Sequence, residues 1–143
     1  MRRTSEPQPL LLDTHVWLWL EEGSDQLVAD ARRAISTALG AGLLRIAAIS
    51  LWELAMLASR GRVVLGKPIG LWLAEALADP GPIIEPLGTE VAIESCELPD
   101  RLHRDPADRM IVATARMTNA VLMTRDRRIL DYAARGHLTA IGV

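Results

Sequence analysis

Short apolar runs alternate along the chain with longer segments in which apolar residues recur every three or four positions. The short runs predict β-strands of a buried sheet, and the longer segments have the period of an amphipathic helix. We expect strands within residues 10–12, 44–50, 82–87, 120–124 and 138–143. We expect helices within residues 13–23, 26–42, 51–61, 71–77, 89–98, 105–119 and 127–136.

The regular alternation of strands and helices is typical of a parallel sheet with helices on both faces. The sequence therefore predicts a three-layer α/β/α domain with a mainly parallel central sheet over residues 10–143. A flexible polar tail, residues 1–9, is expected to precede it. In such folds ligands bind beyond the carboxyl ends of the strands, so candidate site residues are sought there.

Composition narrows the class of protein. The 143 residues suit one domain, and half of them are apolar, which excludes a disordered chain. No apolar run reaches the length of a membrane span, and Cys96 is the single cysteine, so we expect a cytoplasmic protein without disulfides. A net charge of −2 argues against a protein that coats nucleic acid by charge alone. With four tryptophans and one tyrosine, no platform for stacking bases is expected.

Acidic residues follow the predicted strands. Asp13 follows the first strand, Glu53 lies one turn into the helix after the second, and Asp126 follows the fourth. Asp105 and Asp108 begin the long helix before that fourth strand. Each acid alone is also explained by helix capping: Glu53 would form a capping box with Ser50, and the aspartates are good N-terminal residues.

The five acids together favour a metal site. Parallel strands end at one edge of the sheet, so these carboxylates are expected to converge there. Two unit charges about 4 Å apart repel by roughly 4 kcal/mol at an effective dielectric constant of 20. A divalent cation removes this repulsion, and an all-oxygen ligand set favours Mg²⁺ or Mn²⁺. Such sites commonly serve phosphate chemistry.

Arginine dominates the basic residues, with fifteen arginines and one lysine. Arg109, Arg125 and Arg127 flank the acids and are candidates for holding the phosphate groups of a substrate. Surface ion pairs, and the arginine preference of a GC-rich genome, are the alternative explanations.

Four segments in this order resemble the PIN-domain ribonucleases, and in particular the VapC-type toxins of bacterial toxin–antitoxin modules. The segments are "LLLDTHVWLWL", "SLWELAML", "HRDPADRMIVATA" and "LMTRDRRI". The resemblance extends from about Leu10 to Val143. It implies a Mg²⁺- or Mn²⁺-dependent endoribonuclease in which an activated water attacks an RNA phosphodiester.

The resemblance also implies a site. The catalytic acids would be Asp13, Glu53, Asp108 and Asp126, and the metal ligands would be Asp13, Asp108, Asp126 and Asp105. Asp105 remains either a ligand or only the residue that caps the helix. Thr124 matches the hydroxyl residue that precedes the last acid and would support the site.

Partners follow from the same resemblance: an RNA substrate, a VapB-like antitoxin and a second copy of the chain in a homodimer. The apolar helices within residues 49–61 and 68–78 are candidates for receiving the antitoxin, with Trp72 as the side chain expected to be most exposed. The alternatives are a PIN-like interaction module without activity and a Mg²⁺-dependent phosphatase or phosphotransfer domain. The phosphatase is disfavoured because Asp13 lacks a second acid two residues on.

Overall fold

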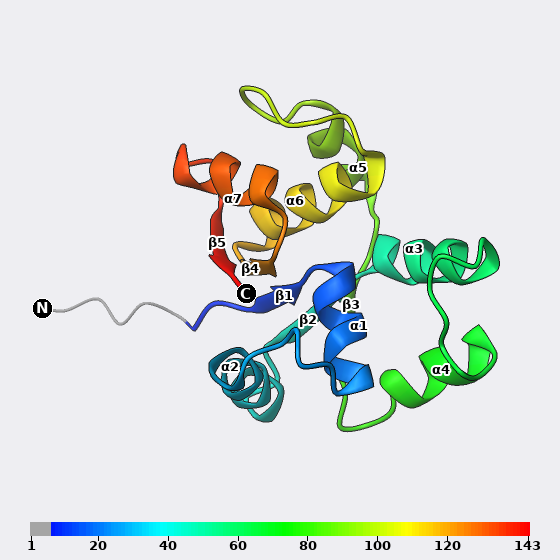
Figure 1. Cartoon of the computed structure of the whole chain (residues 1–143). Coiled ribbons are helices and arrows are strands. Elements are labelled where there is room, and N and C mark those ends of the chain that lie inside the picture. The colour runs from blue at the N-terminus through cyan, green and yellow to red at the C-terminus, as the bar shows by residue number, and fades with distance from the viewer. Residues whose placement is uncertain (1–6) are drawn as a thin grey trace, which may run out of the picture.

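A five-stranded parallel sheet forms the centre of the protein, whose computed structural model describes residues 7–143 (Figure 1). The strand order is β3-β2-β1-β4-β5, and every neighbouring pair is parallel. The strands are β1 (Leu10–Leu12), β2 (Leu44–Ala47), β3 (Ile83–Glu85), β4 (Val121–Thr124) and β5 (Thr139–Gly142). The helices are α1 (Thr14–Glu22), α2 (Ala29–Gly40), α3 (Ala48–Ser59), α4 (Ile69–Ala76), α5 (Thr89–Cys96), α6 (Pro106–Thr118) and α7 (Arg127–Ala134).

Helices cover both faces of the sheet, which confirms the predicted three-layer class. One apolar cluster lies between the sheet and α1, α2 and α4, and the other lies between the sheet and α5, α6 and α7. Figure 1 shows α6 and α7 on the side of the sheet opposite α1 and α2. The strand order reverses at β1, which places β1 and β4 at the switch point where α/β folds bind ligands.

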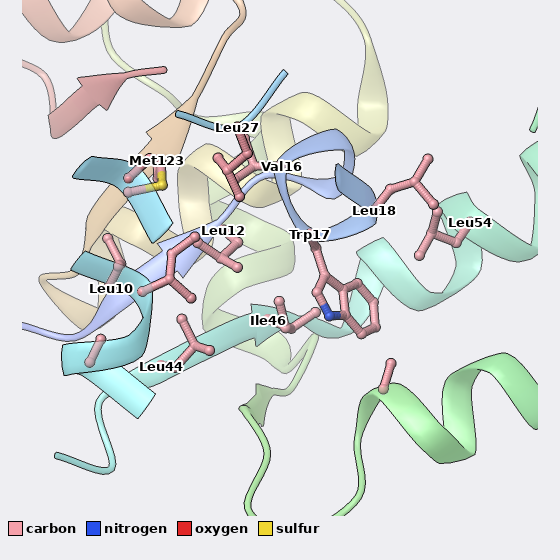
Figure 2. Close-up of a cluster of buried hydrophobic side chains, with 14 of the residues drawn as sticks. Leu10, Leu12, Val16, Trp17, Leu18, Leu27, Leu44, Ile46, Leu54 and Met123 are labelled. Carbon is pink, nitrogen blue, oxygen red and sulfur yellow. The ribbon is translucent and has the colours of Figure 1, made fainter. Parts of the chain in front are cut away.

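Trp17 of α1 forms the centre of the first cluster. Its side chain is fully buried and points toward Ile46 of β2 (Figure 2). The ring of Trp72 meets it edge-on, with 5.4 Å between the centroids. The expectation that Trp72 is exposed is therefore wrong, because this aromatic pair draws α4 onto the core. Trp52 of α3, which is 57% exposed, is the tryptophan that faces solvent.

The outer strands differ from the prediction of strands buried on both faces. All three residues of β1 are buried, whereas Ile83 of β3 and Ile141 of β5 are largely exposed. The helices cover the central strands of the sheet more completely than the edge strands. An apolar sequence therefore predicts that a segment belongs to the sheet, but it does not predict that an edge strand is fully buried.

Two residues of the predicted tail contact the domain. Residues 1–6 of the predicted tail are outside the described part of the chain. Within that part, the amide of Val121 donates to the carbonyl of Pro9 at 2.8 Å, and the Gln8 side chain donates to the carbonyl of Asn119 at 3.2 Å. Residues 8 and 9 are thus tied to the domain. Between residues 7 and 143 the helices are too short or too polar to cross a membrane.

Candidate metal centre

A hollow of about 300 Å³ opens at the carboxyl ends of β1 and β4, and all five predicted acids line it. Its lining consists of Asp13, His15, Val16, Trp19, Glu53, Asp105, Asp108, Arg125, Asp126 and Arg128. We call this hollow the acidic pocket. It brings together residues from α1, α3, the start of α6 and the β4–α7 connection.

A larger hollow, of about 580 Å³, lies at the other end of β4 and β5. Its charged lining residues, Arg116 and Glu94, already form an ion pair at 2.9 Å, and Arg116 also donates to the carbonyl of His137. Those groups serve the fold, so the chemistry is sought in the acidic pocket.

Asp13 connects β1 to α1 and is fixed on both carboxylate oxygens. Oδ1 accepts a hydrogen bond from the Thr14 amide at 2.8 Å, as expected of an N-terminal capping residue. Oδ2 accepts one from the Thr124 hydroxyl at 2.6 Å. Burial raises the pKa of Asp13, although these two hydrogen bonds oppose the rise. The structure thus holds a buried carboxylate in a single orientation.

Thr124 joins two of the acids. Its hydroxyl donates to Asp13 and accepts the backbone amide of Asp126 at 3.0 Å. The side chain is fully buried at the end of β4. This geometry supports the positioning role that the resemblance implies for Thr124.

Glu53 reaches the pocket through contacts between α1 and α3. The Thr14 hydroxyl donates to the Ser50 hydroxyl at 2.9 Å, and both side chains are fully buried. Helix α3 begins at Ala48, so Ser50 lies inside it and the capping box proposed for Glu53 does not form. Burial raises the pKa of Glu53, and the charges of Asp13 and Asp105 add to the rise.

Asp108 is strongly perturbed by its surroundings. Burial, together with the charges of Asp13 and Asp105, raises its pKa to about 6, against the opposing effect of His103. His103 Nε2 lies 2.7 Å from Asp108 Oδ2. Asp105 caps α6 by accepting the Asp108 amide at 3.0 Å, and it still lines the pocket, so capping and ligation are compatible.

His103 is a site residue that sequence reasoning missed. Its other ring nitrogen, Nδ1, is buried and has no partner within the described residues. The contact between Nε2 and Asp108 therefore ties the segment before α6 to this acid. The signal was available in the "HRDPADR" segment, where His103 precedes the two acids.

Arg128 is the second missed residue and provides a positive charge. Its guanidinium donates to Asp126 Oδ2 at 3.1 Å and lies 4.0 Å from Asp108 Oδ2. Asp126 also caps α7 by accepting the Arg128 amide at 2.8 Å. Burial alone would raise the pKa of Asp126, but the hydrogen bonds and charge of Arg128 lower it overall.

The donor set fits a hard divalent cation. Glu53, Asp105 and Asp108 each have a carboxylate oxygen within 4.8 Å of those of the other two. The same distance limit holds for one ligand atom each of His103, Asp108 and Asp126. Asp108 belongs to both groups. Five carboxylates outnumber the two arginines of the pocket, Arg125 and Arg128, and carboxylate oxygens are the ligands that Mg²⁺ and Mn²⁺ prefer.

The three candidate RNA-binding arginines have different surroundings. Arg109 donates to the carbonyls of Ser95 and Leu102 at 2.9 and 3.1 Å, so its guanidinium is committed to the fold and the phosphate role predicted for it is not supported. Arg127 is exposed at the start of α7 and does not line the acidic pocket. Arg125 does line it.

Comparison with known proteins finds a matching family model, a related sequence and similar folds. The PIN domain family matches residues 10–135. Ribonuclease VapC22 of Mycobacterium tuberculosis is 40% identical over 126 residues, covering 86% of this chain and 91% of that protein. DNA-bound VapBC2 from Rickettsia felis superposes with a TM-score of 0.69 at 15% identity, over 94% of this chain and 98% of that one. DNA-bound VapBC from Salmonella typhimurium gives 0.68 at 17% identity, over 95% and 98%. These two structures establish a shared fold.

Proposed function

The chain belongs to the PIN domain family, and we propose that it is a Mg²⁺- or Mn²⁺-dependent endoribonuclease that acts as the toxin of a toxin–antitoxin pair. The observation that supports this most directly is the convergence of five carboxylates in one pocket at the strand ends. The relative from M. tuberculosis is itself described as a ribonuclease.

Asp13, Asp105, Asp108 and Asp126 would hold the metal, with Glu53 beside them. When bound, a divalent ion polarises water and neutralises charge on a phosphodiester. Thr124 orients the Asp13 carboxylate and holds the backbone amide of Asp126, and His103 contacts the Asp108 carboxylate. Arg128, whose head group is 63% exposed, is placed to neutralise an RNA phosphate at the mouth of the pocket.

The alternative functions fit the site less well. A phosphatase or phosphotransfer domain of similar fold uses a nucleophilic aspartate with a second acid two residues on, whereas His15 stands two residues after Asp13. An interaction module without activity would not need Asp13 and Asp108, which are both largely buried and both have raised pKa values. Buried carboxylates whose charged form is disfavoured cost stability, which argues for a function that uses them.

Incubation of the purified chain with total RNA tests the proposed activity. We expect cleavage with Mg²⁺ or Mn²⁺ and none after chelation with EDTA, measured by sequencing of RNA ends. Asp30→Asn is the matched control, because Asp30 is an exposed acid on α2 that pairs with Arg33 away from the pocket. Cleavage that continues in EDTA would refute the metal-dependent mechanism.

We also propose a VapB-like antitoxin as partner and a homodimer as the assembly. The surface that favours a partner helix lies on α3 and α4, where Trp52 and Leu71 are both more than half exposed. A hollow between these helices has apolar walls that include Ala55, Val63 and Ile69. For the dimer, exposed Ile83 and Ile93 on β3 and α5 provide a second apolar surface.

Replacing Trp52 with Asp is expected to weaken antitoxin binding about tenfold or more, because a buried interface tryptophan often dominates affinity. Light scattering of the chain alone should give the mass of a dimer, and titration with the product of the adjacent small open reading frame should give a larger complex. Unchanged affinity of the Trp52→Asp variant would exclude this surface, and a monomeric mass would exclude the dimer.

A further inference from the structure

Three planar side chains line the acidic pocket beside the carboxylates, and the proposed cleavage chemistry does not use them. His15 and Trp19 stand one turn apart on α1, and residues four apart share one face of a helix. Arg125 belongs to the connection between β4 and α7 and lines the same pocket. The small number of aromatic residues predicted no stacking platform, but the fold gathers two planar rings and a guanidinium here.

Trp19 lies next to each of the other two groups. The guanidinium carbon of Arg125 lies 5.4 Å from the centroid of the Trp19 ring, within the range of a cation–π interaction. The rings of His15 and Trp19 are 6.4 Å apart between centroids and are tilted by 57°. The side-chain oxygen of Gln26 accepts a hydrogen bond from Arg125 and so fixes its head group.

Exposure differs among the three in a way that suits a ligand. Trp19 is partly buried and packs against the core, whereas His15 and Arg125 are exposed. Trp19 therefore supports two planar groups that remain accessible to solvent. A surface contact made only for stability would not need to lie in the pocket that holds the acids.

The platform also adjoins the charged centre. His15 follows Asp13 by two residues and lines the acidic pocket together with Asp13 and Glu53. A group resting on His15 would thus lie next to the carboxylates. The carboxylate side of the pocket suits a cation and a phosphate, and the adjacent side, formed by the planar side chains, suits a flat, uncharged ring.

Nucleic acid bases have that shape. Unpaired RNA bases stack on aromatic rings, on histidine and on arginine guanidinium planes, while bases inside a duplex already stack on each other. Resting on the proposed ribonuclease function, we propose that His15, Trp19 and Arg125 form a base-stacking platform that holds an unpaired base next to the cleaved phosphate.

The test combines protein and RNA changes on a fragment that the wild-type chain cuts at one position. An abasic nucleotide is placed in turn at each position beside the cut. At one position we expect kcat/KM to fall about tenfold for the wild type, as loss of one stacked base predicts. Trp19→Leu should cause a similar loss on intact RNA and little further loss on that abasic RNA. Trp19→Phe should restore most of the activity.

Arg125→Ala and His15→Ala should likewise lower kcat/KM on intact RNA and cause little further loss on the abasic RNA. Arg33→Ala, which removes an exposed arginine of α2, should behave like the wild type. If the losses from Trp19→Leu and from the abasic nucleotide simply multiply, Trp19 is only structural and the platform is refuted. The platform is also refuted if no abasic position slows cleavage.

Binding measurements separate this inference from the proposed function. In the Asp108→Asn background the RNA should remain intact, so fluorescence anisotropy can measure affinity for the same abasic series. Position-specific loss of affinity that depends on Trp19, without cleavage by the wild type, would support the platform and refute the nuclease. Cleavage by the wild type without a position-specific loss of affinity that depends on Trp19 would support the nuclease and refute the platform. Absence of both cleavage and binding would refute the nuclease and the platform.

Discussion

Replacing Asp108 with Asn is expected to reduce metal-dependent RNA cleavage about a thousandfold or more. Asp108 is the one residue that belongs to both groups of potential ligand atoms in the pocket. Its loss removes a charged ligand at the centre of the set while keeping the side chain's size. A cation contributes several kcal/mol to phosphodiester cleavage, and about 4 kcal/mol corresponds to a thousandfold change in rate.

The same variant should be more stable than the wild type when metal is absent. Burial and the neighbouring acids Asp13 and Asp105 disfavour the charged form of Asp108, and asparagine removes that unfavourable charge. We expect thermal unfolding in EDTA to occur at a higher temperature, and added Mn²⁺ to stabilise the variant less than the wild type. An inactive variant that is also less stable in EDTA would indicate a folding defect instead.

Metal affinity is expected to fall steeply as the pH decreases below about 6. The pKa of Asp108 is raised to about 6, so this carboxyl takes up a proton in the metal-free protein at mildly acidic pH. A metal ligand must be deprotonated, so each displaced proton lowers the apparent affinity about tenfold per pH unit. Isothermal titration with Mn²⁺ at pH 7.5 and pH 5 measures the change, and Asp108→Asn should flatten it.

The stability of the metal-free protein should change in the opposite direction. An acid whose pKa is higher in the folded than in the unfolded chain binds more protons in the folded state between the two values. The free energy of unfolding should therefore increase as the pH falls from about 7 toward 4, so far as Asp108 determines it. Asp126, whose pKa is lowered by Arg128 despite its burial, works against this at the acidic end. Urea unfolding in EDTA at several pH values measures the balance.

Much of the fold follows from local patterns. The alternation of strands and helices indicated the parallel sheet, and the acids at strand ends then had to face a common edge. Capping chemistry was also readable, since Asp13, Asp105 and Asp126 all cap helices in the structure. Capping and clustering did not prove to be competing explanations, because the N-terminus of a helix that follows a parallel strand lies at the same edge.

What sequence reasoning missed depends on side-chain direction between distant segments. The contact of Arg128 with Asp108 joins α7 to the start of α6, and the contact of Arg125 with Trp19 joins the β4–α7 connection to α1. Neither spacing nor composition predicts which way these side chains turn. The burial of Trp72 against Trp17 has the same origin, because it depends on how α4 packs on α1.

The central claim is that carboxylates from four parts of the chain together form a site that binds a hard divalent cation. Anomalous difference density from a crystal grown with Mn²⁺ tests it most directly. We predict a peak in the acidic pocket in contact with Asp108 and Asp126, and its loss in the Asp108→Asn variant. Crystals of RNA-cleaving protein that show no peak in the acidic pocket, or that show manganese at another site, would contradict this claim.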